Sequence, residues 1–333
     1  MTKTLLIDGN SLLKYGFHGL KYLKTSDKLA AVFFFLNTIR KYINEEGYNK
    51  VFVAWDGIKN YEYRRNLYSP YKIQRKQNNL TDDELFSLNS QRLRIKQYLE
   101  EVYVRQYEFE GYEADDCIAY YCNNTKEKIT IITNDRDLVQ LVKPNVSIKF
   151  LSPPQEYTYK DKIKYQGVEI PIQNIKLVKI LCGDSSDNIS GVKGLGVKTL
   201  VKHFPQISLK TISLEDILIG VNEILKENPK NFRIKNLNEG VTKEGTLGSD
   251  FFSRNIKLVD LSTVHYPPTF EVEMDQIIND TLDPEGRSYK NLLKMMTEDN
   301  IFEFIGKSDD SFLNFVQPFI LLTRVEKNKF KKK

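Results

Sequence analysis

Residues 4–9 read Thr-Leu-Leu-Ile-Asp-Gly, a short apolar run that ends in a carboxylate followed by a glycine. Two later runs, Val51–Trp55 and Ile129–Thr133, have a similar composition and are followed within two residues by Asp56 and Asp135. Short apolar runs of this kind are typical of strands that are buried on both faces of a parallel sheet. The three runs therefore predict the central strands of one sheet, with a carboxylate at the end of each.

Helical patterns separate these strands. Asp27–Glu46, closed by Gly47, and Gln91–Glu101 carry apolar residues at helical spacing. Val102–Tyr107 and Val146–Leu151 are further strand candidates. The alternation of strand and helix predicts an α/β fold with a mostly parallel, doubly wound sheet flanked by helices. Ligands of such sheets bind beyond the carboxyl ends of the strands, so the three aspartates are expected at one edge.

The second half of the chain is predicted to be mainly helical. The expected helices are Pro171–Cys182, Val197–Phe204, Leu214–Lys226, Phe251–Val259 and the stretch from Tyr289 to Phe304. Residues 227–249 are polar and rich in turn residues, which predicts a loop. Residues 324–333 are strongly basic, which predicts a solvated or disordered tail. These patterns divide the chain into two expected domains, residues 1–170 and residues 171–333.

Composition excludes several classes of protein. The 333 residues are 28% charged and 41% apolar, which argues against disordered and fibrous chains. No apolar run reaches the length of about 18 residues that a membrane span needs, and the N-terminus lacks a signal-peptide pattern. The three cysteines have no metal-binding spacing. We therefore expect a soluble protein of a reducing compartment, and its net charge of +5 favours an anionic partner.

Nine carboxylates gather in five places, each where an apolar strand or helix begins or ends. They are Asp8; Asp56; Glu113, Asp115 and Asp116; Asp135 and Asp137; and Asp184 and Asp187. Carboxylates brought together by the fold would raise one another's pKa values unless cations neutralise them. Oxygen ligands without nearby His or Cys suit Mg²⁺ or Mn²⁺. Nine acids exceed the need of one hydrated ion and favour two metal ions about 4 Å apart, as used in phosphodiester hydrolysis.

Each group of acids also has an ordinary structural explanation. Asp8 and Asp56 precede glycines and could be turn residues that end strands. The acids of residues 113–116 could stabilise the first turn of a helix through its dipole. Asp135 could cap the following helix, and Asp184 and Asp187 could cap a polar turn. Five such coincidences at sheet edges and helix starts are improbable together, which favours a common site.

Five ordered motifs carry a family resemblance. They are Trp55-Asp56-Gly57, residues 111–116 (Gly-Tyr-Glu-Ala-Asp-Asp), residues 133–138 (Thr-Asn-Asp-Arg-Asp-Leu), residues 183–189 (Gly-Asp-Ser-Ser-Asp-Asn-Ile) and residues 191–199 (Gly-Val-Lys-Gly-Leu-Gly-Val-Lys-Thr). From Asp8 to about Phe204 the chain resembles the flap endonuclease and 5′-3′ exonuclease family. The resemblance implies a PIN-like catalytic domain with a helical arch at about residues 60–90, and a helical C-terminal part with a helix–turn–helix DNA-binding element. Residues 254–261 resemble most the phage ribonuclease H branch of the family.

The resemblance also assigns roles to the carboxylates. By position, the set around the catalytic metal is Asp8, Asp56, Glu113, Asp115, Asp116 and Asp135. The set around a second metal is Asp137, Asp184 and Asp187. Two Mg²⁺ or Mn²⁺ ions are therefore expected, with Asp8, Asp56, Asp115 and Asp135 among the catalytic residues.

Residues 63–81 contain no acid but several cations interleaved with tyrosines. The cations are Arg64, Arg65, Lys72, Arg75 and Lys76, and the neighbouring aromatics are Tyr61, Tyr63, Tyr68 and Tyr71. Cations for phosphate and aromatics for bases are the two ingredients of single-strand binding, and a solvated basic loop is the alternative. In the family this segment is the arch, and Lys72 and Arg75 match the positions that stabilise charge on the scissile phosphate. The resemblance places Arg64, Arg65, Tyr71 and Lys76 among the nucleic-acid contacts.

Residues 191–199 form a glycine-rich turn before a predicted helix. Backbone N–H groups at a helix N-terminus can hold a phosphate, and an ordinary glycine loop is the alternative. The resemblance implies contacts to the duplex backbone, often with a K⁺ ion, and such contacts carry no sequence information. The matching residues are Lys193, Gly194, Gly196, Lys198 and Thr199.

The resemblance implies a metal-dependent, structure-specific 5′ nuclease. Its expected substrates are the RNA strand of RNA–DNA hybrids and flapped or nicked duplex DNA, in phage DNA replication if the ribonuclease H branch is right. Expected partners are these nucleic acids and a single-strand DNA-binding protein, with the nuclease acting as a monomer in the cytoplasm, away from membranes. A catalytically silent branched-DNA-binding module would lack some of the nine acids. A PIN-domain ribonuclease of the toxin kind would be shorter and lack the turn at residues 191–199.

Overall fold

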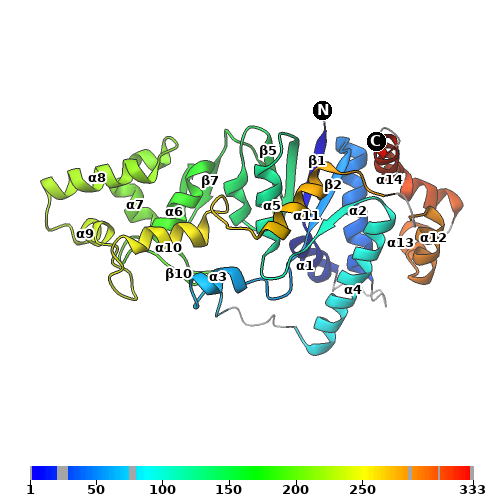
Figure 1. The fold of residues 1–333 in the computed structure, drawn as a ribbon, viewed down its shortest axis with the longest axis horizontal. Coiled ribbons are helices and arrows are strands. Elements are labelled where there is room, and N and C mark those ends of the chain that lie inside the picture. The colour runs from blue at the N-terminus through cyan, green and yellow to red at the C-terminus, as the bar shows by residue number, and fades with distance from the viewer. Residues whose placement is uncertain (1, 21–28, 75–79, 284–286, 307, 331–333) are drawn as a thin grey trace.

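The structure is a computed structural model that describes residues 2–20, 29–74, 80–283, 287–306 and 308–330. A six-stranded sheet lies at its centre, with strand order β3-β2-β1-β4-β5-β6 (Figure 1). The strands are β1 (Lys3–Asp8), β2 (Lys50–Ala54), β3 (Arg105–Tyr107), β4 (Lys128–Thr133), β5 (Val146–Leu151) and β6 (Pro154–Tyr157). The first five are parallel and β6 is antiparallel to β5. The expected α/β fold with a mostly parallel sheet is confirmed.

Helices surround the sheet. In chain order they are α1 (Gly9–Leu20), α2 (Ala30–Glu46), α3 (Glu62–Leu67), α4 (Asp82–Glu101), α5 (Ala114–Asn123), α6 (Ile175–Cys182), α7 (Val197–His203), α8 (Leu214–Glu227), α9 (Phe232–Asn238), α10 (Asp250–Val259), α11 (Pro268–Asn279), α12 (Tyr289–Glu298), α13 (Phe302–Ile305) and α14 (Asp309–Phe330). Short 3₁₀ turns are η1 (Asp137–Leu141), η2 (Ile172–Asn174) and η3 (Pro205–Ser208). Two small hairpins pair β7 (Lys162–Tyr165) with β8 (Val168–Pro171), and β9 (Gly183–Asp184) with β10 (Ile189–Ser190).

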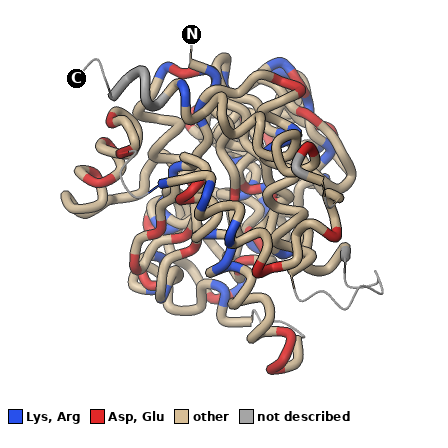
Figure 2. The backbone as a smooth tube through the Cα atoms, turned by 90° about the vertical axis from the view of Figure 1, so that its right-hand side faces the viewer, with Lys and Arg blue, Asp and Glu red and all other residues tan. Residues whose placement is uncertain are grey.

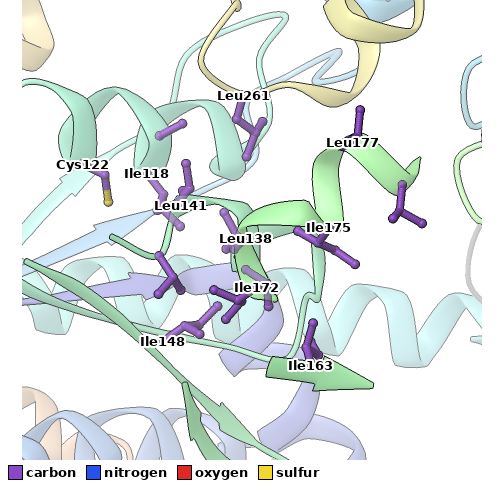
Figure 3. Close-up of a cluster of buried hydrophobic side chains, with 14 of the residues drawn as sticks. Ile118, Cys122, Leu138, Leu141, Ile148, Ile163, Ile172, Ile175, Leu177 and Leu261 are labelled. Carbon is purple, nitrogen blue, oxygen red and sulfur yellow. The ribbon is translucent and has the colours of Figure 1, made fainter. Parts of the chain in front are cut away.

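The two faces of the sheet belong to different hydrophobic cores. Leu5 and Ile7 of β1 pack in one core with residues of α1, α2 and α4. Leu6, between them, packs in the other core with residues of α5, η1 and α6. Figure 3 shows part of this second core, where apolar side chains from β5, η1 and α6 converge. A strand buried on both faces needs apolar residues at every position, which is why the strands appear as unbroken apolar runs.

Both cores contain residues from both expected domains. The last helices pack back onto the first half of the chain: α14 contacts α2, and α12 contacts α4. Met296 and Phe319 are fully or almost fully buried in the same core as Leu5. The ring of Phe304 stacks on that of Phe33 in α2, with 4.7 Å between centroids. In Figure 1, α12–α14 lie at one end of the molecule and α8 and α9 at the other. Each hydrophobic core therefore includes residues from both sides of the expected domain boundary at residue 170.

Several expected boundaries differ from the observed ones. Helix α4 begins at Asp82 and not at Gln91, because Thr81 and Glu84 form a capping box that starts it earlier. The helix expected from Pro171 begins at Ile175, because residues 168–171 pair with β7 as a strand. The predicted loop at residues 227–249 contains α9, and the predicted tail is helical as far as Phe330. The expected start of α2, at residues 27 and 28, lies outside the described residues.

Two glycines shape the carboxyl edge of the sheet. A Cβ on Gly9 would lie 2.5 Å from the ring of Trp55, and one on Gly57 would lie 1.8 Å from the backbone oxygen of Phe109. Both distances are too short for any side chain, so each Asp-Gly pair allows close packing directly after a carboxylate. The glycines thus let α1 and the segment after β2 approach the sheet, which brings Asp8 and Asp56 to the same edge.

None of the helices in the described ranges has the combination of length and apolarity needed to cross a bilayer. Charge is distributed over the whole molecule. Figure 2 shows acidic and basic residues interspersed along the chain and not separated into two halves. Any preference for a nucleic acid must therefore come from particular side chains around a site.

Candidate active site

A cavity of about 700 Å³ opens at the carboxyl edge of the sheet. Five of the predicted carboxylates line it: Asp8, Asp56, Glu113, Asp115 and Asp135. They come from the ends of β1, β2 and β4 and from the start of α5, so the switch point of the sheet brings them together. Lys72 lines the cavity as well, as do Asn10, Ser11 and Lys14 of α1, Tyr61 beside α3, and Asp82 of α4.

Backbone and hydroxyl donors hold these carboxylates in place. Asp8 accepts hydrogen bonds from the backbone N–H of Ser11 at 2.9 Å and from the hydroxyl of Thr133 at 2.8 Å. Asp56 accepts one from the backbone N–H of Ala114 at 2.9 Å. Asp135 accepts one from the backbone N–H of residue 137 at 2.8 Å. Each carboxylate keeps acceptor capacity that these neutral donors do not use.

The cluster is electrostatically unfavourable by itself. Burial, together with the charges of Asp56 and Asp135, raises the pKa of Asp8 to about 7. Burial and the neighbouring acids Asp135 and Asp8 hold the pKa of Asp115 well above its usual value. Burial also raises the pKa of Asp56. Carboxylates in this state bind protons or metal cations readily, because either one removes the repulsion.

A second group of carboxylates lies beside the cavity. Asp137, Asp184 and Asp187 each offer one oxygen, and these oxygens lie within 4.8 Å of one another. They line a small cavity of about 20 Å³ that shares Glu113 and Asp115 with the large one. Burial and the charge of Asp135 raise the pKa of Asp137 to about 6, although Lys179 acts to lower it. Eight of the nine predicted carboxylates thus line one of two adjoining cavities.

The ninth, Asp116, points elsewhere. It is fully buried, and its two oxygens accept hydrogen bonds from the guanidinium of Arg64 at 2.7 and 2.9 Å. Arg64 also donates to Glu113 at 3.1 Å. Predicted as a nucleic-acid contact, Arg64 is only 3% exposed and belongs to this internal network.

Glu113 is the centre of the network. Its carboxylate accepts hydrogen bonds from Lys72 Nζ at 2.5 Å and from the hydroxyl of Tyr71 at 2.9 Å. Burial acts to raise the pKa of Glu113, but Lys72 and Arg64 lower it below its usual value. Tyr71, predicted as a nucleic-acid contact, is 2% exposed, so its ring is not available for stacking in this structure.

The remaining predicted contacts are placed as follows. Arg65 is exposed and its guanidinium lies over the ring of Tyr61, 5.1 Å from the centroid. Arg75 and Lys76 lie outside the described residues. In the glycine-rich turn, Lys193, Gly194, Gly196 and Lys198 are exposed and Thr199 is half-buried. Gly194 has a φ of +80°, which accounts for one of the glycines of the turn.

Sequence reasoning missed Asn10, Lys14 and Lys179 among the residues that line the two cavities. Asn10 and Lys14 face the cavity from α1, and the amide nitrogen of Asn10 is buried without a hydrogen-bond partner among the described residues. Their spacing of four residues places them on one face of a helix. This pattern points to a polar face on α1 directly after Asp8. Tyr61 replaces Tyr71 as the aromatic residue that lines the cavity. Lys179 is a single lysine in the apolar face of α6, and it contacts Asp137 and Asp184.

Residues 3–169 match the profile of the 5′-3′ exonuclease N-terminal resolvase-like domain. This chain belongs to the 5′-3′ exonuclease family. The 5′-3′ exonuclease of Mycoplasmopsis pulmonis is 30% identical over 226 residues, which cover 64% of this chain and 70% of the relative. The predicted family and the predicted enzyme class, a nuclease, are thereby confirmed.

Other relatives in the exonuclease family are parts of larger proteins. DNA polymerase I of Caldicellulosiruptor bescii is 36% identical over 231 residues, which cover 67% of this chain. The match covers 26% of that polymerase, so this chain spans about a quarter of the length of the polymerase relatives.

Two solved structures of bacteriophage T5 proteins share the fold of this chain. The T5 D15 protein co-crystallized with metal ions is 22% identical, with a TM-score of 0.58. The T5 5′-exonuclease with bound zinc is 21% identical, with a TM-score of 0.56. In both cases the match covers 90% of this chain and 98% of the other. The likeness confirms the PIN-like fold class, whereas the helix–turn–helix element stays a prediction.

The donors of the site fit divalent cations. Every predicted ligand is a carboxylate oxygen, which suits hard ions such as Mg²⁺, Mn²⁺ or Ca²⁺. The pKa values of Asp8, Asp56, Asp115 and Asp137 are raised, so a cation would relieve repulsion that is built into the fold. The chemistry of these residues therefore agrees with a metal-binding member of the family.

Proposed function

We propose that this protein is a Mg²⁺- or Mn²⁺-dependent 5′ nuclease that recognises the structure of its substrate. The observation that carries the proposal is the cavity of about 700 Å³ in which five carboxylates face Lys72 and Lys14. A cavity lined by cation-binding acids and by ammonium groups suits a phosphodiester, because the bound cations and the lysines would both attract its negative charge. Its substrates would be RNA primers in RNA–DNA hybrids and flapped or nicked duplex DNA.

Two sets of carboxylates would hold the cations. Asp8, Asp56, Asp115 and Asp135 would hold one ion, with Glu113 at their side, and residues 137, 184 and 187 would hold the other. When bound, such ions polarise the phosphodiester and make a water molecule more acidic. Asp116, which the resemblance placed in the first set, would act through Arg64 as part of the scaffold.

The chain's own cations would position the phosphate. Lys72 is held at the cavity by Glu113 and has a positive φ of +50°, a conformation fixed by its surroundings. Its backbone N–H donates to the carbonyl of Asp187 at 3.0 Å, so the lysine is tied to both groups of acids. We assign to Lys72 the stabilisation of charge on the phosphate during cleavage, and to Lys14 the binding of a neighbouring phosphate. Arg75 and Lys76 stay in the proposal as arch residues.

Binding of the duplex is assigned to the turn at residues 191–199. Lys193 and Lys198 are exposed there, with the N-terminus of α7 between them. Contacts of this kind would grip the backbone, with a K⁺ ion as a further ligand of the turn, and would make binding sensitive to salt. A role in phage primer removal, a monomeric state and a single-strand DNA-binding protein as partner complete the proposal.

The test compares 5′-labelled and internally labelled flap, nicked and RNA–DNA hybrid substrates, with Mg²⁺ and with EDTA. We expect cleavage at or near the 5′ end that requires the metal and releases short products. Tight binding to branched DNA without any cleavage in Mg²⁺ would instead support the silent binding module. Cleavage of single-stranded RNA alone would support a ribonuclease of another kind.

A further inference from the structure

Lys179 is a buried lysine inside the second carboxylate group. Its side chain is 6% exposed, and its ammonium forms ion pairs with Asp137 and, at 2.6 Å, with Asp184 Oδ2. It comes from the middle of α6, whose other inward residues are apolar. A lysine buried in this way is costly unless anions pair with it, so its position is set by these two carboxylates.

The donors around this group leave little room for a metal ion. Asp184 uses both oxygens: Oδ2 accepts from Lys179, and Oδ1 accepts from the backbone N–H of Ser186 at 2.9 Å and from its hydroxyl at 2.5 Å. Asp187 accepts a hydrogen bond from the hydroxyl of Tyr71 at 3.2 Å. At Asp137 and Asp184 an ion must therefore compete with the ammonium of Lys179 that is already present.

Space leads to the same conclusion. The adjoining cavity of about 20 Å³ holds about one water molecule, so it does not accommodate a hydrated ion beside the ammonium. A lysine stem of four carbons is flexible enough to withdraw its ammonium from the carboxylates. Ser186 and Tyr71 are neutral donors, whereas an ammonium repels a cation. Lys72 lies 3.7 Å from Asp187, but Lys179 is the ammonium in direct contact with Asp137 and Asp184, so it is the group that must leave these two carboxylates.

We propose that Lys179 is a built-in counter-ion that competes with the metal at Asp137, Asp184 and Asp187. In the absence of metal the ammonium pairs with Asp137 and Asp184 and offsets part of their charge. A divalent ion binds there only by displacing it, so this group fills at a higher metal concentration than the carboxylates of the large cavity. The inference rests on the proposed function only in that both groups bind divalent ions, and no step of nucleic-acid cleavage enters it.

The test measures Mn²⁺ binding to the full chain without nucleic acid, by calorimetry and by the electron paramagnetic resonance signal of free Mn²⁺. We expect two classes of site in the wild type, with the weaker one lost in Asp187→Asn. Lys179→Met should tighten the weaker class by at least about tenfold and leave the stronger class unchanged. Lys176→Met is the matched control, because Lys176 lies on the same helix but pairs with Asp260 at 2.7 Å. It should change neither class.

Weaker or unchanged Mn²⁺ binding in Lys179→Met would overturn the proposal and make Lys179 a residue that orients the metal ligands. If Lys179→Met does not fold, the wild type provides a second measurement. Reductive methylation followed by peptide mass spectrometry should modify Lys179 slowly without metal and faster at saturating Mn²⁺, with Lys176 unaffected. Equal or slower modification of Lys179 with Mn²⁺ would contradict displacement. None of these measurements uses nuclease activity. A wild type that binds Mn²⁺ as expected but cleaves no nucleic acid would therefore contradict the proposed function and not the role of Lys179.

Discussion

Arg64 and Asp116 form a two-pronged ion pair inside the protein. Arg64 Nη1 lies 2.9 Å from Asp116 Oδ2, and Nη2 lies 2.7 Å from Oδ1. Asp116 also accepts the backbone N–H of Glu113 at 2.9 Å, so both of its oxygens are occupied. Its neighbour Asp115 faces the large cavity. Two adjacent acids at the start of one helix therefore have different surroundings, because successive helical residues point in different directions.

Asp116→Asn should destabilise the protein without removing metal binding. The substitution leaves the buried guanidinium of Arg64 without its main anion, and breaking such a pair costs about 3–5 kcal/mol. Chemical denaturation would measure the loss, and calorimetry with Mn²⁺ would follow metal affinity. A stable variant that has lost a metal ion would show that Asp116 is a ligand, as the resemblance implies.

Asp115→Asn and Asp135→Asn should each abolish Mg²⁺-dependent cleavage and retain binding to branched DNA. Both carboxylates line the large cavity, where the charge of Asp135 raises the pKa of Asp8 and of Asp115, and the charge of Asp8 also raises that of Asp115. For the same reason, both variants should be more stable than the wild type when metal is absent. Gel-based cleavage, binding in Ca²⁺ and thermal unfolding in EDTA test the three effects. Metal-dependent turnover in both variants would remove these residues from the site.

Lys72→Ala should lower the rate of cleavage far more than the affinity for DNA. Lys72 lines the cavity beside the carboxylates, where it would act on charge that develops in the transition state. Loss of one such group typically lowers the rate by about 10²–10³-fold. Single-turnover rates at saturating enzyme, compared with dissociation constants in Ca²⁺, separate the two effects. Equal losses in both would reduce Lys72 to a binding residue.

Lys14→Ala should do the opposite and weaken binding more than the rate. Lys14 is exposed at the mouth of the cavity, where a phosphate next to the scissile one would pass. Losing one phosphate contact lowers the slope of log affinity against log salt by about 1. Lys41→Ala is the control, because Lys41 is an exposed lysine of α2 that does not line the cavity. An unchanged salt slope in Lys14→Ala would contradict this role.

Glu127→Gln should destabilise the fold at neutral pH and less so in acid. Glu127 accepts hydrogen bonds from Thr4 at 2.6 Å, Lys50 at 3.0 Å and Tyr121 at 2.8 Å. Burial acts to raise its pKa, but Thr4 and Lys50 lower it below the usual 4.5. Because the pKa of Glu127 is lower in the folded state than in the unfolded state, its charged form stabilises the fold above pH 4.5. This contribution is lost as the pH falls through the folded-state pKa. Urea denaturation should show a difference of about 1–3 kcal/mol from the wild type at pH 7 that shrinks below pH 4.5. A difference that grows in acid would be inconsistent with this account.

The strands of the sheet and the carboxylates after them could be predicted from the sequence because both signals are local. Unbroken apolar runs mark strands buried on two faces, and parallel strands deliver the residues after them to one edge. Helix α9 and the early start of α4 were missed because few of their apolar residues are buried, with Ile234 and Leu237 in α9 and Leu88 as the first in α4, and a capping residue marks where each begins. The helical end of α14 was missed because a basic segment resembles a solvated tail even when the helix before it is packed in the core.

By itself the sequence determined the fold class, the family and a set of acids, since these depend on residue type and order along the chain. Only the tertiary structure decided which acids face the cavities, that Asp116 is bound to Arg64, and that Lys179 occupies the second group. The physical reason is that a charge's role depends on its nearest neighbours in space. Arg64 and Asp116 are 52 residues apart in the chain, and no local pattern records that they meet.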